Sequence, residues 1–398
     1  MSIRVTVVGI DGGEPSGEAR AAIDAATLVV GGRRNLELAG VPDGARTVVL
    51  GALDPAFEAI GEHEGAAVVV ASGDPGFFGI VRALRERGLR VSVVPALSSV
   101  ARAFAHAGMS WDDAMVVSAH GRELRRAVNV CRAFGKVAVL TAPGAGPAEL
   151  ARELHPQTPR TFVVCEDLGG PDERVTVVRP AEATTRPWRD PNIVIVYDPR
   201  RAVGPMGWLA GGRPGPGAWA LPEDGFEARN GQITKAEVRA LVLARIGPRV
   251  GDLVWDIGAG SGSVGIECAR FGAAVIAVER DEESCARIRR NVQAHGVKVA
   301  VSRGTAPDVL QYLPDPDTAF VGGGGMPAIE ECARRALRTT VVTLAAVDRV
   351  PQTLAVLRDH GHTAEAVQLS AARLKPLPDL THRLDALNPI FVVSGTRP

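Results

Sequence analysis

A glycine-rich turn flanked by two apolar segments restricts the fold of this chain more than any other feature. Residues 255–262 read Trp-Asp-Ile-Gly-Ala-Gly-Ser-Gly, and the next apolar run, residues 273–278, is followed directly by Glu279. Residues 253–255 have the pattern of a buried strand, and Ser263 begins a helical pattern. Glycines at such a turn let the backbone approach a ligand without a Cβ in the way, and a helix N-terminus presents free N–H groups to an anion. The pattern therefore predicts a strand–turn–helix unit of an α/β sheet with a ligand at the turn.

The ligand that this turn favours is S-adenosylmethionine (SAM) rather than a nicotinamide dinucleotide. A dinucleotide fingerprint needs Gly-x-Gly-x-x-Gly, whereas position 263 is serine here and Asp256 lies two residues before the first glycine. Glu279, after the second strand, is placed to accept hydrogen bonds from both ribose hydroxyls. The turn is similar to that of class I SAM-dependent methyltransferases. A nicotinamide-dependent dehydrogenase is a distant alternative, which a lack of NADPH binding would exclude.

The composition argues against several other classes of protein. Lys plus Arg equal Asp plus Glu, at 45 each, so nothing favours a nucleic-acid partner. No apolar run reaches the ~18 residues that a membrane span needs. The chain opens on a strand pattern rather than a secretory signal, which predicts a cytoplasmic protein. The five cysteines form no C-x-x-C pair, so we expect reduced thiols and no metal site.

The 398 residues are enough for two or three domains. Residues 199–222 contain six glycines and five prolines, a density at which no helix or strand pattern persists. We place a joint there, between a first domain at residues 1–198 and a second at residues 223–398. Apolar side chains predict that the joint packs on one of the domains; they are Trp208, Leu209, Trp219 and Leu221.

Strand and helix patterns alternate in the second domain. Thr234 to Glu237 fit a capping box, with Thr234 as the N-cap of a helix. The alternation predicts a Rossmann-like parallel α/β sheet with helices on both faces. Its strands are predicted at residues 253–256, 274–278, 298–301, 318–321, 340–344 and 391–394.

The first domain also alternates, and each predicted strand there ends in a small polar turn. Ligands of open α/β sheets bind at the carboxyl ends of strands, so we expect these turns to share one site. The strands are predicted at residues 5–8, 66–71, 91–94, 115–117 and 137–140, and the turns at residues 9–13, 72–79, 95–99, 118–122 and 141–144.

Four segments of the first domain resemble the tetrapyrrole methylases, a two-lobed α/β family of SAM-dependent enzymes, in the branch that methylates precorrin-6Y. They are residues 71–79 (ASGDPGFFG), 110–114 (SWDDA), 118–122 (SAHGR) and 165–169 (CEDLG). The second domain resembles the class I methyltransferase that is the partner of this branch. That resemblance rests on Thr234-Lys235, the Asp256 turn, the four glycines after Val321, and residues 383–389 (RLDALNP). The two halves together are similar to the fused, decarboxylating precorrin-6Y methyltransferase family.

The resemblance implies methylation of precorrin-6Y at C5 by the first domain and at C15 by the second. It also implies loss of CO₂ from the C12 acetate, which gives precorrin-8 in cobalamin (vitamin B12) biosynthesis. A small tetrapyrrole is then the substrate, SAM is the cofactor at one molecule per domain, and a homo-oligomer is expected. The implied cofactor-binding residues of the second domain are Thr234, Asp256, Gly258, Ala259, Gly260, Ser261, Gly262, Glu279, Gly304, Thr305, Ala306 and Gly322. Those of the first domain are Gly73, Asp74, Phe77, Ser98, Ser99 and Ala142.

Cationic side chains are candidates for the substrate, because a corrin precursor carries many carboxylates and arginine pairs with them bidentately. Arg373, Lys375 and Arg383 lie near the motif of the second domain. Arg122 is the candidate of the first domain, and His120 is a polar candidate above the ring. Ordinary surface or structural roles are equal alternatives for each, and the sequence identifies no general acid or base.

Three positions of the first domain depart from the family pattern. The opening loop usually continues Gly-Pro-Gly where this chain has Asp11-Gly12-Gly13; Ala96 stands for a glycine, and Ala142 for an aspartate. These departures leave open a monofunctional C15-methyltransferase and decarboxylase whose first domain only holds the substrate. Two further alternatives are a cobalt-containing substrate and a non-catalytic tetrapyrrole carrier. Failure to bind S-adenosylhomocysteine would favour the carrier.

Overall fold

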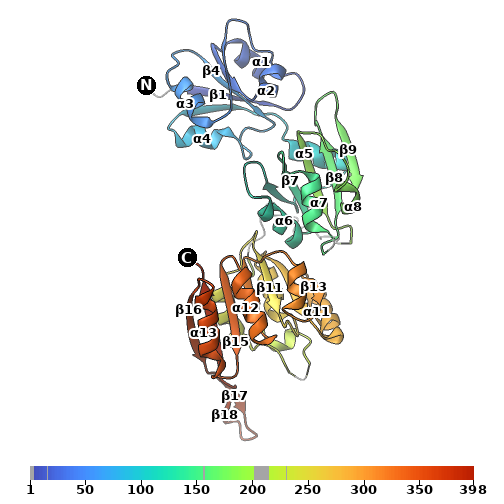
Figure 1. Ribbon diagram of the computed structural model, residues 1–398. Helices are drawn as coiled ribbons and strands as arrows, with labels where there is room; N and C mark the ends of the chain where they lie inside the picture. Colours follow the sequence, from blue (N-terminus) through green and yellow to red (C-terminus); the bar gives the residue numbers. More distant parts are fainter. Residues whose placement is uncertain (1–3, 16, 156, 201–214, 230) are drawn as a thin grey trace. The chain divides into compact units, whose positions relative to one another are not determined.

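The computed structural model describes residues 4–398 except residues 16, 156, 201–214 and 230. Contacts group the described residues into two compact units, whose elements are labelled in Figure 1. Unit 1 comprises those of Met1–Arg122, Lys136–His155 and Pro159–Gly211, and unit 2 those of Glu123–Gly135, Pro156–Thr158 and Gly212–Pro398. Helix α6 (Leu124–Ala133) thus groups with unit 2. The domain bounds at residues 198 and 223 stay a prediction.

The first half of unit 1 is a five-stranded parallel sheet in the order β3-β2-β4-β1-β5. Alternate residues of β1 face opposite cores: Val8 and Ile10 pack with α1 and α2, whereas Val5 and Val7 pack with α3 and α4. Nearly continuous valine runs are typical of strands buried on both faces. The elements are β1 (Arg4–Ile10), α1 (Gly17–Asp24), β2 (Leu28–Gly31), α2 (Arg33–Ala39), β3 (Arg46–Val49), α3 (Leu53–Gly61), β4 (Ala67–Ser72), α4 (Ile80–Glu86) and β5 (Arg90–Val94).

The second half of unit 1 is a mixed sheet in the order β6-β7-β10-β8-β9, in which only the β6–β7 pair is parallel. Helix α5 (Ser99–Ala107) packs on it through Val100, Ala103 and Phe104. The two-lobed α/β prediction is confirmed, although five of the ten strands of unit 1 (β2, β3, β8, β9 and β10) were not predicted. The remaining elements are β6 (Met115–Ser118), β7 (Lys136–Leu140), α7 (Pro147–Leu154), β8 (Thr161–Glu166), β9 (Arg174–Val178), α8 (Pro180–Ala183) and β10 (Asn192–Tyr197).

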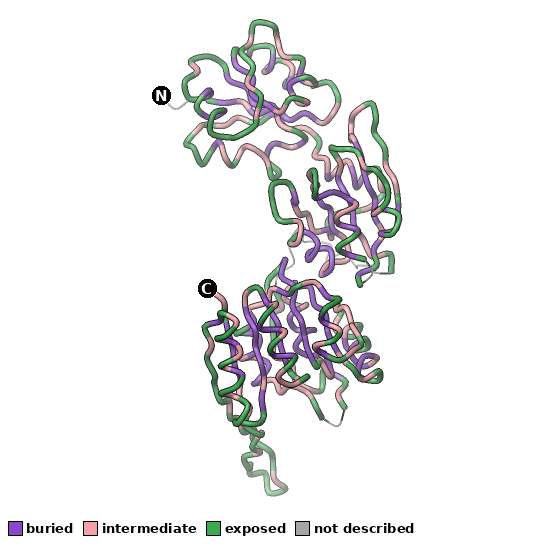
Figure 2. Tube along the Cα trace, in the orientation of Figure 1, coloured by how far each residue is buried: buried purple, intermediate pink, exposed green. Residues whose placement is uncertain are grey.

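Unit 2 contains a seven-stranded sheet in the order β13-β12-β11-β14-β15-β19-β16, and its central strands are buried in Figure 2. Neighbouring strands are parallel except at β19, which is antiparallel to both β15 and β16. Helices α9 and α10 pack on one face, and α12 and α13 on the other. The Rossmann-like prediction is therefore confirmed. The strand predicted at residues 391–394 is antiparallel to its neighbours rather than parallel, and the edge strand β16 (Thr363–Leu369) was not predicted.

The bounds in unit 2 agree closely with the predicted ones for most strands. Strand β13 begins two residues later than predicted, at Ala300. The elements are η1 (Glu223–Gly225), α9 (Ala236–Ile246), β11 (Leu253–Ile257), α10 (Ser263–Arg270), β12 (Ala274–Glu279), α11 (Glu282–Ala294), β13 (Ala300–Arg303), η2 (Asp308–Tyr312), β14 (Thr318–Val321), α12 (Gly325–Arg335), β15 (Thr339–Leu344), α13 (Arg349–Asp359), β16 (Thr363–Leu369) and β19 (Ile390–Thr396).

A separate antiparallel hairpin, β17 (Ala372–Pro376) and β18 (His382–Ala386), extends from unit 2 and was not predicted (Figure 1). Nearly all of its residues are exposed (Figure 2), so it lacks the buried face that produces an apolar/polar alternation.

No helix of the described residues is long and apolar enough to cross a membrane. All five cysteines are buried, and no disulfide joins them in the described part of the chain.

Candidate functional site

The carboxyl ends of β11 and β14 form the point at which the strand order of unit 2 reverses. Ligands of open α/β sheets bind in the crevice at such a point. The turns after these two strands touch there: a Cβ on Gly258 would lie 2.8 Å from the N and Cα atoms of Gly323, and Gly258 has a φ of +69°. Both the close approach and the left-handed backbone require glycine, so the predicted turn lies at the switch point with its backbone accessible.

Glu279 reaches from the end of β12 back to this turn. Its Oε2 accepts a hydrogen bond from the N–H of Gly260 at 3.0 Å. Its Oε1 accepts from the N–H groups of Arg280 and Asp281 at 2.9 and 3.0 Å. A half-buried carboxylate fixed beside the turn offers acceptor oxygens suited to the two hydroxyl groups of a ribose.

The other predicted cofactor residues of unit 2 divide by exposure. Those that are exposed or half-buried can touch a ligand; they are Gly258, Ala259, Gly260, Gly304, Thr305 and Gly322. Buried members shape the turn instead; they are Ser261, Gly262 and Ala306. The carbonyl oxygen of Ser261, for example, accepts a hydrogen bond from Asn291 Nδ2 at 2.8 Å.

Asp256 is buried beneath the turn, with 1% of its surface exposed. Its Oδ2 accepts a hydrogen bond from the N–H of Gly265 in α10 at 2.8 Å, and its Oδ1 has no partner among the described residues. Burial raises the pKa of Asp256 to about 7, against the lowering effect of the Gly265 bond. The carboxylate therefore joins β11 to α10 from inside.

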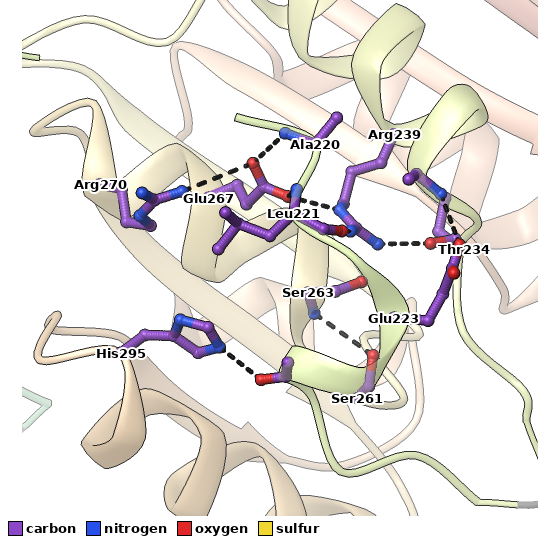
Figure 3. A network of polar contacts seen from close by, with 12 residues as sticks. Ala220, Leu221, Glu223, Thr234, Arg239, Ser261, Ser263, Glu267, Arg270 and His295 are labelled. Atoms are coloured by element: carbon purple, nitrogen blue, oxygen red, sulfur yellow. Dashed lines mark hydrogen bonds and ion pairs between the residues drawn. The ribbon is translucent and has the colours of Figure 1, made fainter. Parts of the chain in front are cut away.

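Thr234 is not the N-cap of its helix, so the predicted capping box is wrong. Helix α9 begins one residue later than the box requires, and its N-cap is Lys235, whose side chain makes no capping bond. The carboxylate of Glu223 caps the helix instead, accepting from the N–H of Ala236 at 2.8 Å (Figure 3). Glu237 binds Arg373 rather than the start of the helix. Thr234 remains half-buried, with its carbonyl oxygen bound to Arg239.

A buried ion pair joins the two helices that pack beside the turn (Figure 3). Arg239 of α9 and Glu267 of α10 are 0% exposed, and Nε lies 2.5 Å from Oε1. Arg239 also donates to the carbonyl oxygens of Thr234 and Leu221. Because every charge is paired and hydrogen-bonded, the pair fixes α9 and α10 relative to each other without a buried, unpaired charge.

The sequence analysis missed this pair, although a signal existed. Arg239 belongs to the apolar stripe of α9 with Val242, Leu243 and Ile246, and Glu267 lies beside Val264 and Cys268 in that of α10. Charged residues at core positions are rare unless they are paired.

The C-terminal end of the joint, residues 215–222, packs on unit 2, as predicted for the joint. The N–H groups of Ala220 and Leu221 donate to Glu267 at 2.6 and 3.0 Å. Trp219 lies against Phe271, with ring centroids 6.3 Å apart. Trp208 and Leu209 lie outside the described residues.

A cavity of about 470 Å³ opens at the same edge of the sheet, where β15 ends and α9 begins. Thr234, Lys235, Glu237, Thr343 and Asn388 supply its polar lining, and the rest is mainly aliphatic. Strand β15 is two strands from β11, so the near wall of the cavity, at Thr343, is on the order of 10 Å along the edge from the glycine turn.

The hairpin brings the three candidate cations of unit 2 together. In its register Arg373 is opposite Asp385, and Lys375 is opposite Arg383. Because side chains alternate between faces, these four residues share one face and Leu374 and Leu384 the other. Arg383 pairs with Asp385 at 3.1 Å. For Lys375, which is exposed, no side-chain partner is found in the described part of the chain.

In unit 1, three of the predicted turns meet at the end of the parallel sheet. A Cβ on Gly9 would lie 2.4 Å from the Gly73 carbonyl oxygen and 2.7 Å from Ala96 N. A Cβ on Gly73 would lie 3.3 Å from Ser99 N. The turns after β1, β4 and β5 thus pack backbone to backbone, and the expected gathering is found for these three. Those after β6 and β7 belong to the other sheet.

The remaining candidates of unit 1 lie around these turns or at the end of the second sheet. Asp74 Oδ1 accepts from the N–H of Gly76 at 2.8 Å, and Phe77 is 38% exposed. Ser98 is the N-cap of α5, its Oγ accepting from Ala101 N–H at 3.1 Å. Three candidates follow strands of the second sheet: Ala142 is half-buried after β7, and His120 and Arg122 are exposed after β6.

Asp11, the first departure from the family pattern, has a partner of its own. Arg102 of α5 donates to the Asp11 carbonyl oxygen at 3.1 Å and to Oδ2 at 3.2 Å, and it also lies 3.9 Å from Glu173. Gly169, between β8 and β9, packs so closely on this loop that a Cβ would lie 2.0 Å from the Asp11 carbonyl oxygen. The altered loop is therefore held by a specific set of contacts.

In comparisons with known proteins, the two halves of the chain match two different families. The family of Tetrapyrrole (Corrin/Porphyrin) Methylases matches residues 4–184, and the Precorrin methyltransferase domain matches residues 224–394. A Precorrin-6Y C(5,15)-methyltransferase (decarboxylating) of Sinorhizobium sp is 36% identical over 394 residues, covering 95% of this chain and 92% of that protein. A protein of the same name from Mycobacterium tuberculosis (strain CDC 1551 / Oshkosh) is 35% identical, covering 81% and 80%. A Probable cobalt-precorrin-6B C(15)-methyltransferase (decarboxylating) of Pyrobaculum calidifontis is 35% identical, covering 44% of this chain and 94% of that protein.

Proposed function

Because the chain belongs to the family of decarboxylating precorrin-6Y C(5,15)-methyltransferases, we propose that it methylates precorrin-6Y at C5 and C15 and removes CO₂ from the C12 acetate. The product is precorrin-8, an intermediate of cobalamin biosynthesis. Unit 1 carries out the C5 methylation, and unit 2 the C15 methylation and the decarboxylation. Each unit binds one molecule of SAM.

One observation carries the proposal for unit 2: the contact between the turns of Gly258 and Gly323, with Glu279 bound beside it. At this contact the backbone of the switch point carries no side chains, so the methionine end of SAM can lie against it. Glu279 offers hydrogen-bond acceptors to the ribose. Gly304 and Thr305, after β13, are then placed along the adenine.

SAM supplies an electrophilic methyl group on a sulfonium. The bridging carbons of a reduced tetrapyrrole are enamine-like nucleophiles, so the protein mainly has to align the two reactants and exclude water. In unit 2 the turn fixes the donor, and the cavity lined by Thr234 and Asn388 receives the edge of the ring. In unit 1 Gly73, Asp74, Ser98 and Ser99 hold the donor, with His120 and Arg122 toward the ring.

The test is the mass of the product after the purified chain is incubated with precorrin-6Y and methyl-labelled SAM. We expect two labelled methyl groups to be gained and one CO₂ to be lost. One methyl group gained with CO₂ lost would mean that unit 1 only holds the substrate.

A cobalt-containing substrate is the second candidate, because the Pyrobaculum calidifontis relative is named for a cobalt-precorrin. Conversion of cobalt-precorrin-6B by the purified chain, with no conversion of precorrin-6Y, would establish this alternative.

The cytoplasmic location and the homo-oligomer belong to the same proposal. The hairpin supports self-association, since an isolated pair of strands is only marginally stable and Leu374, Leu380 and Leu384 are 69%, 89% and 68% exposed. Light scattering should show a smaller assembly for the Leu374→Ser/Leu384→Ser variant, and an unchanged mass would remove the hairpin as the interface.

A further inference from the structure

Arg373 is held by two carboxylates from two other elements of unit 2. Its Nε and Nη2 donate to Glu237 at 2.8 and 2.7 Å, and its Nη1 and Nη2 donate to Glu223 at 2.9 and 2.8 Å. Glu223 lies in η1 and Glu237 in the first turn of α9, whereas Arg373 lies in β17. One guanidinium thus ties the hairpin both to η1, which directly follows the joint, and to the helix that borders the cavity.

This arrangement has one carboxylate more than the charge of the arginine balances. The two glutamates repel each other, which acts to raise the pKa of Glu237, although the bonds to Arg373 hold the pKa of both carboxyls below the usual range. The side chains of Arg373, Glu237 and Glu223 are 42%, 36% and 20% exposed, so water and solutes reach the group. Exposed pairs of this kind add little to stability, so one carboxylate can be exchanged for another at small cost.

The place of the group suggests what would be exchanged. Glu237 also lines the cavity, together with Lys235. From there the same face of the hairpin continues with Lys375, Arg383 and Asp385. Asp385 pairs with Arg383 at 3.1 Å, so the face keeps an excess of positive charge at Lys375. A face with three cations and one acid that starts at a cavity suits a ligand with an apolar ring and several carboxylates at its edge, and arginine can bind a carboxylate bidentately.

We propose that Glu223 and Glu237 occupy Arg373 in place of substrate carboxylates. When the tetrapyrrole enters the cavity, one of its acetate or propionate groups replaces a glutamate on Arg373, while Lys375 and Arg383 bind neighbouring carboxylates. This inference rests on the proposed function for the class of substrate, and it assigns to the two glutamates a role in selecting polycarboxylates.

The proposal predicts effects of opposite sign within one cluster. Loss of Arg373 removes the site, whereas loss of one glutamate charge removes a competitor. A cluster that only fastens the hairpin would lose binding from either change, because all three residues would then contribute to the same contact.

The experiment titrates the full-length chain with uroporphyrin III, an octacarboxylate tetrapyrrole, and follows its fluorescence. We expect Arg373→Met to weaken binding at least about tenfold, and Glu223→Gln and Glu237→Gln each to tighten it about threefold or more. Glutamine at position 223 can still accept the bond from Ala236 N–H, so the cap of α9 is kept. Equal weakening by all three variants, no change in any of them, or no binding by the wild type would overturn the proposal.

Arg290→Met is the matched control, because it breaks an ion pair between the segment that follows η1 and helix α11, Arg290 to Glu227 at 2.8 Å, and neither residue lines the cavity. This variant should leave uroporphyrin III binding unchanged. If it weakened binding as much as Arg373→Met does, the effect of Arg373→Met would reflect only the loss of an ion pair that holds unit 2 together. Binding of S-adenosylhomocysteine checks that each variant is folded. The precorrin-6Y assay separates the proposed reaction from the proposed role of Arg373. If the wild type forms the product and the Arg373→Met variant has the same KM for precorrin-6Y, the proposed function stands and only the role of Arg373 is refuted.

Discussion

The candidate cofactor sites of the two units are assembled in different ways. In unit 2 the main part of the site is one segment of sequence, because the turn Gly258 to Gly262 and the acid Glu279 belong to consecutive strands. The loops at Gly304 and Gly323 are added to it from further along the chain. In unit 1 it comes from turns at Gly9, Gly73 and Ser98, which lie far apart in sequence and meet only in the folded sheet. The site that is more compact in sequence is not more closely packed, because the sites of both units contain backbone contacts that a single added Cβ would block.

The difference also appears in what supports each site. Behind the turn of unit 2 lie a buried carboxylate, Asp256, and the fully buried pair Arg239 and Glu267. In unit 1 the loop is held by the partly exposed pair Asp11 and Arg102. The site of unit 2 is therefore fixed from inside, and the loop of unit 1 is fixed from its surface.

The largest effect is expected from Gly258→Ala. The new Cβ would lie 2.8 Å from the Gly323 backbone at a φ of +69°, so the turns must separate. We expect C15 methylation and loss of CO₂ to fall at least about 100-fold while C5 methylation continues, as measured by product mass. Gly296→Ala is the control, since it has a similar φ of +61° with open space around it. Equal losses in both variants would mean that backbone strain alone is responsible.

Gly9→Ala makes the corresponding change in unit 1. Its Cβ would lie 2.4 Å from the Gly73 carbonyl oxygen, so the turns after β1 and β4 must move apart. C5 methylation should fall at least about tenfold, with C15 methylation and decarboxylation retained. Gly44→Ala, where the Cβ meets open space, should leave both reactions unchanged. If C5 methylation survived Gly9→Ala, this packing would not form a working site.

The buried Asp256, which supports the glycine turn of unit 2 from beneath, should make the stability of this unit depend on pH. Burial raises the pKa of Asp256 to about 7, whereas a carboxyl in an unfolded chain titrates near ~4. Between these values the folded chain keeps a proton that the unfolded chain has lost, so this group lowers the free energy of unfolding as pH rises. An asparagine side chain cannot ionise. As the pH rises from 4 to 8, the free energy of unfolding of Asp256→Asn should therefore increase relative to that of the wild type, by on the order of 1 kcal/mol or more.

Urea unfolding at the two pH values measures this change. Asp359→Asn, at the exposed end of α13, serves as the control and should show no such gain. A stability difference for Asp256→Asn that does not vary with pH would contradict the assignment of a raised pKa.

The smallest effect is expected at the loop of unit 1. Arg102→Met removes the bonds to Asp11 and the approach to Glu173, which should cost unit 1 about 1 kcal/mol in thermal unfolding. Arg87→Met breaks a more exposed pair with Asp54 and should cost less. Equal losses would show that the Asp11 loop has no special support.

The sequence predicted local features far better than distant ones. The turn of unit 2 was found because Gly258, Gly260, Gly262 and Glu279 lie in a single strand–turn–helix–strand segment with a distinctive spacing. Most strands whose turns carry motifs were found in both units, but β8, which ends in the motif of residues 165–169, was missed. Strands β2 and β3 lack such a turn, and the β17–β18 hairpin is exposed on both faces, so neither gave a usable pattern.

Pairings between distant charges could not be predicted from the sequence. Thr234 was interpreted as an N-cap from its spacing to Glu237, but Glu223 caps α9, and Glu237 binds Arg373 from 136 residues away. The partner of Asp11 likewise depends on the contact of the first loop with α5. Such contacts depend on the tertiary fold, and local spacing contains no information about them.

The number of S-adenosylhomocysteine molecules bound per chain, measured by isothermal titration calorimetry, tests most directly the claim that each unit contains its own cofactor site. We expect two molecules per wild-type chain and one per chain after Gly258→Ala. A single molecule per wild-type chain that is lost with Gly258→Ala would contradict the account, because unit 1 would then bind no cofactor.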